Sequence, residues 1–137
     1  MITIKFVKNK MSVLTQEDAA ILVATQGNNV TIPDSFTSIG DYAFSGESLK
    51  TVIIPDSVTS IGKYAFAHNN LANVTIGNSV TSIDWSAFLS NRLTTVIIPG
   101  SVKYIGDDAF GSNSLATVII PDSVTYIGWY AFSDNEL

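Results

Sequence analysis

A repeat of constant length runs through most of this chain. From residue 30 to residue 137, the same residue types recur every 22 positions without an insertion or deletion. One such column consists of the isoleucines Ile39, Ile61, Ile83, Ile105 and Ile127. A unit this short cannot bury its own apolar face, but stacked units can bury theirs against each other. The spacing therefore predicts a strand-dominated α/β-type solenoid of five repeats, at residues 30–51, 52–73, 74–95, 96–117 and 118–137.

Each repeat contains the same succession of local signals. The segments "TVII" and "NVTI" alternate, are rich in β-branched residues and end at proline or glycine, which predicts short strands stacked into a parallel sheet. The segment "VTSIG" predicts a second, shorter strand, and the alanine–phenylalanine pair that follows predicts a single helical turn. A recurring asparagine is expected to bond to unpaired backbone groups of the turns; this column consists of Asn69, Asn91, Asn113 and Asn135.

The first 29 residues do not fit the repeat. "ITIKFV" predicts a strand, and "TQEDAAILVAT" predicts a short helix with Thr15 as N-cap, Asp18 in a capping-box variant and Gly27 as its stop. Because an open first coil would expose apolar side chains and a strand edge, residues 1–29 are interpreted as an N-terminal cap. The last repeat has no such cover. We expect either that the chain is cut from a longer protein, which is the favoured alternative, or that another chain covers this end.

The segment "VIIPDSVTSIGKYAF" and its counterparts resemble the BspA-like leucine-rich repeats, the Treponema pallidum class. The resemblance covers residues 30–137 and depends on the pattern I-P-x-S-V-x-x-I-G-x-x-A-F. It implies a right-handed leucine-rich-repeat superhelix with a parallel sheet on its concave side and no shared catalytic residues. Members of this family occur largely in bacterial surface and secreted proteins and are associated with adhesion and protein binding. The resemblance therefore implies a cell-surface or secreted location, although no signal peptide is predicted here.

Charge and composition limit the classes of partner and chemistry. The formal net charge is −5, and three of the seven basic residues lie in the first ten positions, so the repeats are not expected to bind nucleic acid or anionic lipid. The apolar run near the start is too short to insert into a membrane. The chain has no cysteine, His68 is interpreted as a solvated turn residue, and Asp107–Asp108 is a turn pair rather than a calcium site. No enzyme activity, cofactor or metal is therefore expected.

The outward positions of the predicted strands form the first candidate binding surface. They are uncharged and mostly β-branched: Thr51, Ile53, Asn73, Thr75, Thr95, Ile97, Thr117 and Ile119. Such residues also simply suit strands, and a regular threonine array raises the alternative of ice binding, which the interspersed isoleucine and asparagine disfavour. Three exposed isoleucines in one column form an apolar patch of a kind that soluble proteins avoid, which favours a binding face.

A second candidate surface consists of aromatic residues that gather toward the C-terminal repeats: Trp85, Tyr104, Tyr126, Trp129 and Tyr130. Exposed tyrosine and tryptophan are typical of binding hot spots, although they also cover core edges. The predicted function is a non-catalytic module that binds a protein, in preference to a glycan, on the concave sheet. The alternative is a structural spacer or a segment that self-associates through its uncapped last repeat.

The third repeat departs from the pattern at two turns. Gly77 occupies a proline position, and Asp84 occupies a glycine position that we expect to need a positive φ. Glycine can also end a strand, and aspartate is among the few other residues that tolerate a positive φ. Both changes are therefore interpreted as tolerated drift that leaves the backbone like that of the neighbouring repeats.

Overall fold

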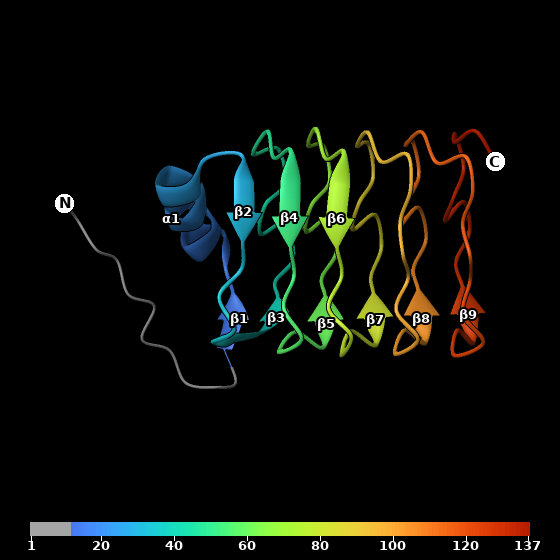
Figure 1. Cartoon of the computed structure of the whole chain (residues 1–137), viewed down its shortest axis with the longest axis horizontal. Coiled ribbons are helices and arrows are strands. Elements are labelled where there is room, and N and C mark those ends of the chain that lie inside the picture. Colours follow the sequence, from blue (N-terminus) through green and yellow to red (C-terminus); the bar gives the residue numbers. More distant parts are fainter. Residues whose placement is uncertain (1–11) are drawn as a thin grey trace.

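The computed structural model describes residues 12–137 as a solenoid of stacked coils with a helix at its N-terminal end (Figure 1). This confirms the predicted fold class. We number the coils 1 to 5 after the repeats that begin at residues 30, 52, 74, 96 and 118. The elements are β1 Ser12–Leu14, α1 Gln16–Gln26, β2 Asn29–Thr31, β3 Phe36–Ile39, β4 Thr51–Ile53, β5 Ser60–Ile61, β6 Asn73–Thr75, β7 Ser82–Ile83, β8 Tyr104–Ile105 and β9 Tyr126–Ile127. The strand predicted in "ITIKFV" lies outside the described residues.

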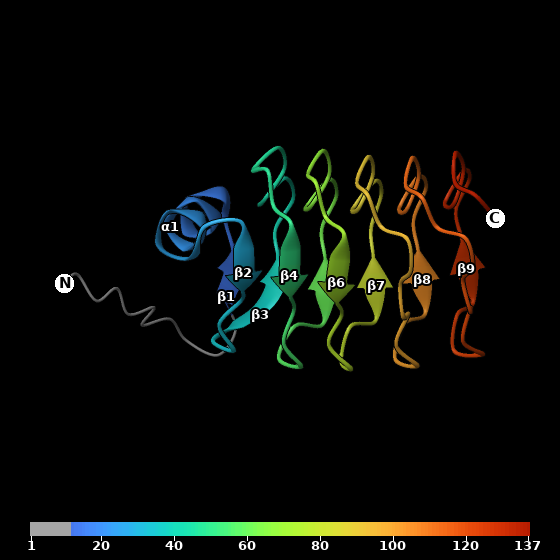
Figure 2. The same ribbon diagram turned by 45° about the horizontal axis from the view of Figure 1, so that its top comes forward.

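Within residues 12–137, two parallel sheets run along different faces of the solenoid (Figures 1 and 2). The six-stranded sheet has the order β1-β3-β5-β7-β8-β9, and from β3 onward each residue pairs with the one 22 positions later, as Ile61 does with Ile83. The three-stranded sheet has the order β2-β4-β6. The "VTSIG" segments, which were expected to be short secondary strands, thus form the sheet that runs through all five coils. The "TVII" and "NVTI" segments were expected to form a sheet through every repeat, but that sheet ends at β6.

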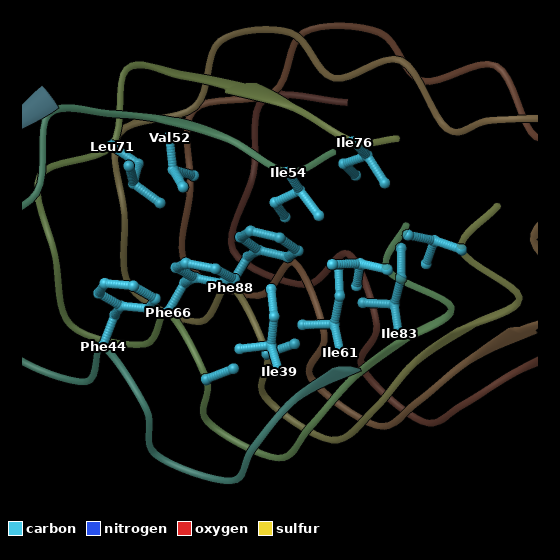
Figure 3. Packing of buried hydrophobic residues seen from close by; sticks show 14 of the residues in the cluster. Ile39, Phe44, Val52, Ile54, Ile61, Phe66, Leu71, Ile76, Ile83 and Phe88 are labelled. Atoms are coloured by element: carbon cyan, nitrogen blue, oxygen red, sulfur yellow. The ribbon is translucent and has the colours of Figure 1, made fainter. Parts of the chain in front are cut away.

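The core consists of columns that each contribute one residue type per coil (Figure 3). Phe44, Phe66, Phe88 and Phe110 are fully buried, and successive rings stack with centroids 5.2 Å apart and planes within 8°. Val52 and Ile54 are 1% exposed, whereas Ile53 between them is 47% exposed. This confirms that alternate strand residues point into the core.

The buried asparagine column joins adjacent coils through side-chain hydrogen bonds. Asn91 Oδ1 accepts the N–H of Leu71 at 3.0 Å, while Asn91 Nδ2 donates to the carbonyl oxygens of Phe66 at 2.9 Å and Phe88 at 3.1 Å. The same three bonds recur at Asn69, Asn113 and Asn135. Each side chain thus satisfies backbone groups on two coils, which confirms the predicted role of this column.

The turns after the glycine column differ from the helical turns expected there. They are tight i to i+3 turns, such as Ala43 N–H to Gly40 O at 3.2 Å, and α1 is the only helix in residues 12–137. The positive φ, between 51° and 59°, falls on non-glycine residues, including Tyr42, Tyr64, Ser86, Asp108 and Tyr130 two positions after this column. The expectation that the column itself needs a positive φ is therefore wrong. Its glycines permit close approach, because a Cβ on Gly106 would lie 2.7 Å from the Trp85 nitrogen.

Asp84 occupies the glycine column and supplies a hydrogen bond that its neighbours obtain from the preceding coil. In coil 2, the N–H of Lys63 donates to Asp41 Oδ1 of coil 1 at 2.8 Å. Trp85 is the residue of coil 3 that corresponds to Lys63. The residue that corresponds to Asp41 in coil 2 is Lys63 itself, which has no carboxylate to accept the Trp85 N–H. The Trp85 N–H donates to Asp84 Oδ1 at 2.7 Å instead. The substitution is thus accommodated by a local bond.

Helix α1 lies against the first coil (Figure 1). Thr15 is its N-cap, and both capping-box bonds are present: Thr15 N–H donates to Asp18 Oδ2 at 3.0 Å and Asp18 N–H donates to Thr15 Oγ1 at 3.3 Å. The helix ends at Gly27, as predicted. Ala19 and Leu22 are buried in the main core cluster, so the helix extends the core beyond coil 1. Within residues 12–137, no helix is long and apolar enough to cross a membrane.

Candidate functional site

The structure places the outward strand residues on one continuous, uncharged face, which we call the recognition face. It consists of Thr51, Ile53, Asn73, Thr75, Thr95, Ile97, Thr117 and Ile119, and all but the partly buried Thr51 are exposed. Exposure of the isoleucine column rises along the solenoid, from 47% at Ile53 to 85% at Ile97 and 84% at Ile119. The most exposed apolar side chains of this face therefore lie in coils 4 and 5.

Backbone pairing on the recognition face stops after coil 3. Ile32 N–H donates to Ile53 O at 3.0 Å, and Ile54 N–H donates to Thr75 O at 2.8 Å. In the described chain, the next bond of this series, from Ile76 N–H to Ile97 O, is not formed, and residues 96–98 and 118–120 donate no backbone hydrogen bond. Figure 1 shows the contrast, since β2, β4 and β6 are arrows while the corresponding parts of coils 4 and 5 are plain tubes.

Two clefts occur where the ladder is interrupted. The inner cleft, of about 360 Å³, lies where coil 3 faces coil 4, between residues 73–76 and residues 95–97, with Asn78 and Pro99 at its end. The outer cleft, of about 320 Å³, lies where coil 4 faces coil 5, between residues 95–98 and Thr117, Ile119 and Pro121. Ile97 lines both clefts, and neither cleft has a charged residue in its lining.

Gly77 forms the turn beside the inner cleft and lies unusually close to coil 2. A Cβ at this position would overlap the carbonyl oxygen of Pro55. In addition, Asn78 N–H donates to Asp56 Oδ1 at 2.7 Å, a bond that no equivalent turn makes within residues 12–137. The turn bond from Val80 N–H to Gly77 O is kept at 3.4 Å. The turn bond at Gly77 is thus like that of the neighbouring turns, and β6 pairs with β4 in the regular register; the ladder is interrupted only on the side of coil 3 that faces coil 4.

Replacing Gly77 with alanine is expected to lower the free energy of unfolding by about 1–3 kcal/mol, because the new Cβ forces the backbone away from Pro55. Gly100 provides the matched control, since a Cβ there meets nothing within 4 Å and its φ is not positive. Gly100→Ala is expected to raise the free energy of unfolding by about 0.4–1 kcal/mol, because alanine lowers the conformational entropy of the unfolded chain. Chemical denaturation measures both changes, and equal effects would contradict the close approach at Gly77.

The aromatic candidates are only partly brought together. Trp85 Nε1 donates to the Tyr104 hydroxyl at 3.1 Å, and the Tyr104 and Tyr126 rings stack with centroids 5.0 Å apart. All three lie along the six-stranded sheet: Trp85 just after β7, Tyr104 in β8 and Tyr126 in β9. Trp129 and Tyr130 are 75% and 67% exposed, and no described side-chain contact links them to the other three. The aromatic residues therefore lie along a different sheet from the recognition face.

Sequence reasoning missed two contributors to these surfaces. Lys63 places its Nζ 4.3 Å from the centroid of the Trp85 ring, a cation–π contact that partly covers this tryptophan. The signal was available, because Lys63 stands 22 positions before Trp85 in the same column. The inner cleft was also missed, since its walls include Val74 and Ile76, which were expected to be fully paired in the sheet.

The described residues also show where the candidate metal-ligating and histidine side chains lie. Within residues 12–137 there is no group of three histidine, cysteine, aspartate or glutamate side chains that could hold a metal ion. His68 is exposed in a tight turn with a φ of 57°. The two clefts present apolar side chains and unpaired backbone groups.

Comparison with known proteins assigns this arrangement to a family. The profile described as the BspA type leucine rich repeat region matches residues 23–137 in six copies, so it begins inside the segment interpreted as the cap. None of the curated proteins compared with the chain matches it.

Solved structures of leucine-rich repeat proteins superpose on the chain. The Treponema pallidum leucine rich repeat protein is 31% identical with a TM-score of 0.73, over 78% of this chain and 54% of that protein. A leucine-rich repeat protein from Bacteroides capillosus is 27% identical with a TM-score of 0.65, over 88% and 87% of the two chains. One from Bacteroides ovatus is 29% identical with a TM-score of 0.61, over 76% and 30%. The chain thus spans about half the length of the T. pallidum protein.

Proposed function

Because the chain belongs to the BspA-type leucine-rich repeat family, we propose that it is a non-catalytic module that recognises a protein through the recognition face. The observation that carries this proposal is the exposure of Ile97 and Ile119, at 85% and 84%, on an uncharged strand face. Contiguous exposed apolar surface is unfavourable in water and commonly marks an interaction site. Adhesion, which the family resemblance implies, is one form of such recognition.

The chemistry of the recognition face favours a protein over a glycan. A glycan presents hydroxyl groups and is held by polar and aromatic side chains, whereas this face presents isoleucine and threonine around two clefts without charged linings. The exposed tryptophans and tyrosines that suit a sugar ring follow the six-stranded sheet instead. A partner that buries Ile97 and Ile119 gains from removing their apolar surface from water, at about 25 cal/mol per Å².

We expect Ile97→Lys to weaken binding of a protein partner by at least tenfold, because a charge would be placed in the lining of both clefts. Protein binders are first selected with the immobilised chain from a displayed library of small domains, and their affinities are then measured by biolayer interferometry. Val13→Lys is the matched control, since Val13 is an exposed apolar strand residue on the six-stranded sheet. Selected binders that are insensitive to Ile97→Lys would contradict the proposed site.

Self-association is the second candidate function, because one core column becomes exposed in the last coil. Ile127 is 46% exposed, whereas the equivalent Ile39, Ile61, Ile83 and Ile105 are at most 2% exposed. A second copy of the chain could bury this end face with its own last coil, because helix α1 covers the other end of the stack. A dimer in light scattering that Ile127→Lys dissociates and Ile97→Lys leaves intact would favour this function over recognition.

A further inference from the structure

We propose that the partner binds by strand addition, with an uncharged, extended polypeptide segment lying in the inner cleft and pairing its backbone with the interrupted ladder. This inference rests on the proposed function and specifies the chemistry of the partner. It differs from recognition by side chains alone, because the groups that hold the partner are backbone N–H and C=O groups of coils 3 and 4. Three features of the inner cleft support it.

The first feature is the orientation of the unpaired backbone groups. Directly after β4, Ile54 directs its N–H toward the next coil, where Thr75 O accepts it. Residues 22 positions later occupy the same place in the coil, so Ile76 directs its N–H toward coil 4. No acceptor meets it there in the described chain, and the N–H of Ile97 on the opposite wall is also without a partner. Both walls therefore present the edge of a strand to the cleft.

The second feature is the lining of the cleft. All nine residues that line it are uncharged, although the chain as a whole carries a formal net charge of −5. A charged side chain inserted here would lose hydration without meeting an opposite charge. The segment that fits consequently has apolar or small polar side chains, alternately on the side of Val96 and on the side of Ile97.

The third feature is the chemistry that can satisfy the unpaired groups of a strand edge. A polypeptide in extended conformation presents N–H and C=O groups at the spacing of a strand, which is the basis of recognition by strand addition. A glycan or a lipid chain does not supply donors and acceptors in this order. The exposed Ile97 beside the unpaired backbone then gives the added strand an apolar side-chain contact as well.

The proposal can be tested with a defined probe, a capped pentapeptide of alternating valine, threonine and isoleucine, titrated into the chain and followed by amide resonances in NMR. We expect saturable shifts at the amides of Ile76 and Ile97. A second peptide of the same sequence carries N-methyl groups at alternate residues, which keeps the side chains and removes the ladder donors. We expect it to bind at least tenfold more weakly. Ile97→Lys is expected to weaken the first peptide by a similar factor, and Val13→Lys is expected to leave its binding unchanged.

Each other outcome overturns strand addition in a distinguishable way. Equal binding of the two peptides would show that side chains alone hold the partner, which leaves the proposed recognition function in place. Absence of shifts up to the solubility limit of the first peptide would exclude the cleft as a strand site. Hydrogen exchange of the free chain adds an independent check, because the amides of residues 96–98 should exchange faster than those of residues 52–54. Equal protection of the two segments would mean that the ladder is closed in solution.

Discussion

Replacing Phe88 with alanine is expected to lower the free energy of unfolding by about 3–5 kcal/mol, the cost of removing a large buried aromatic side chain. Phe88 is fully buried in coil 3 between the rings of Phe66 and Phe110, with both centroids 5.2 Å away. Neither neighbour can fill the space alone, because each also stacks on the ring on its other side, Phe66 on Phe44 and Phe110 on Phe132. Equilibrium denaturation followed by circular dichroism measures the loss.

The position of Phe88 in the stack makes this effect larger than its own volume suggests. In a solenoid each coil contacts only its neighbours, so a weakened middle coil uncouples the two ends. We therefore expect the single unfolding transition of the wild-type chain to broaden or split in Phe88→Ala. Phe132→Ala is the matched control, because Phe132 is only partly buried in the last coil and stacks on Phe110 alone, at 5.4 Å. Equal losses in the two variants would contradict this account.

The core could be predicted from the sequence because each buried column appears as an apolar residue that recurs every 22 positions. Phe88 is buried for the same reason as Phe66, and one correct assignment of this phenylalanine settles its position in coils 1 to 4. The asparagine column was predictable on the same basis, since a polar residue repeated among buried positions must satisfy backbone groups. Helix α1 was predictable from local signals at Thr15, Asp18 and Gly27.

The features that escaped prediction depend on distances between coils, which the repeat pattern does not contain. The glycine column was attributed to a positive φ, yet its actual cause is the backbone of the preceding coil, 2.7 Å from a Cβ on Gly106. The interrupted ladder likewise depends on the distance between coils 3 and 4, where Ile76 N–H meets no carbonyl oxygen in the described chain. Ile53, Ile97 and Ile119 are identical in the pattern, but the structure separates them by exposure and by the clefts beside the latter two.

Replacing Asn91 with alanine is expected to cost about 3 kcal/mol of unfolding free energy, although it removes only a small side chain. The N–H of Leu71 and the carbonyl oxygens of Phe66 and Phe88 would lose their partner, and leaving a buried polar group unsatisfied costs about 1–3 kcal/mol. Asn135→Ala removes equivalent bonds in the half-buried last coil, where water can replace them, and is expected to cost less than half as much. Thermal and chemical denaturation of both variants measures the difference.

The variant Asn91→Asp separates hydrogen bonding from packing at this position. Aspartate keeps the shape and the acceptor for Leu71, but its second oxygen faces the carbonyl oxygens of Phe66 and Phe88 in place of a donor. Burial beside these oxygens should raise the pKa of the new carboxyl above its usual range. The charged form is then unfavourable in the folded state, so the deficit relative to the wild type should be largest at neutral pH. It should shrink as the pH falls through the raised pKa, because the protonated carboxyl can donate again. A deficit that does not change with pH would mean that Asn91 acts through packing alone.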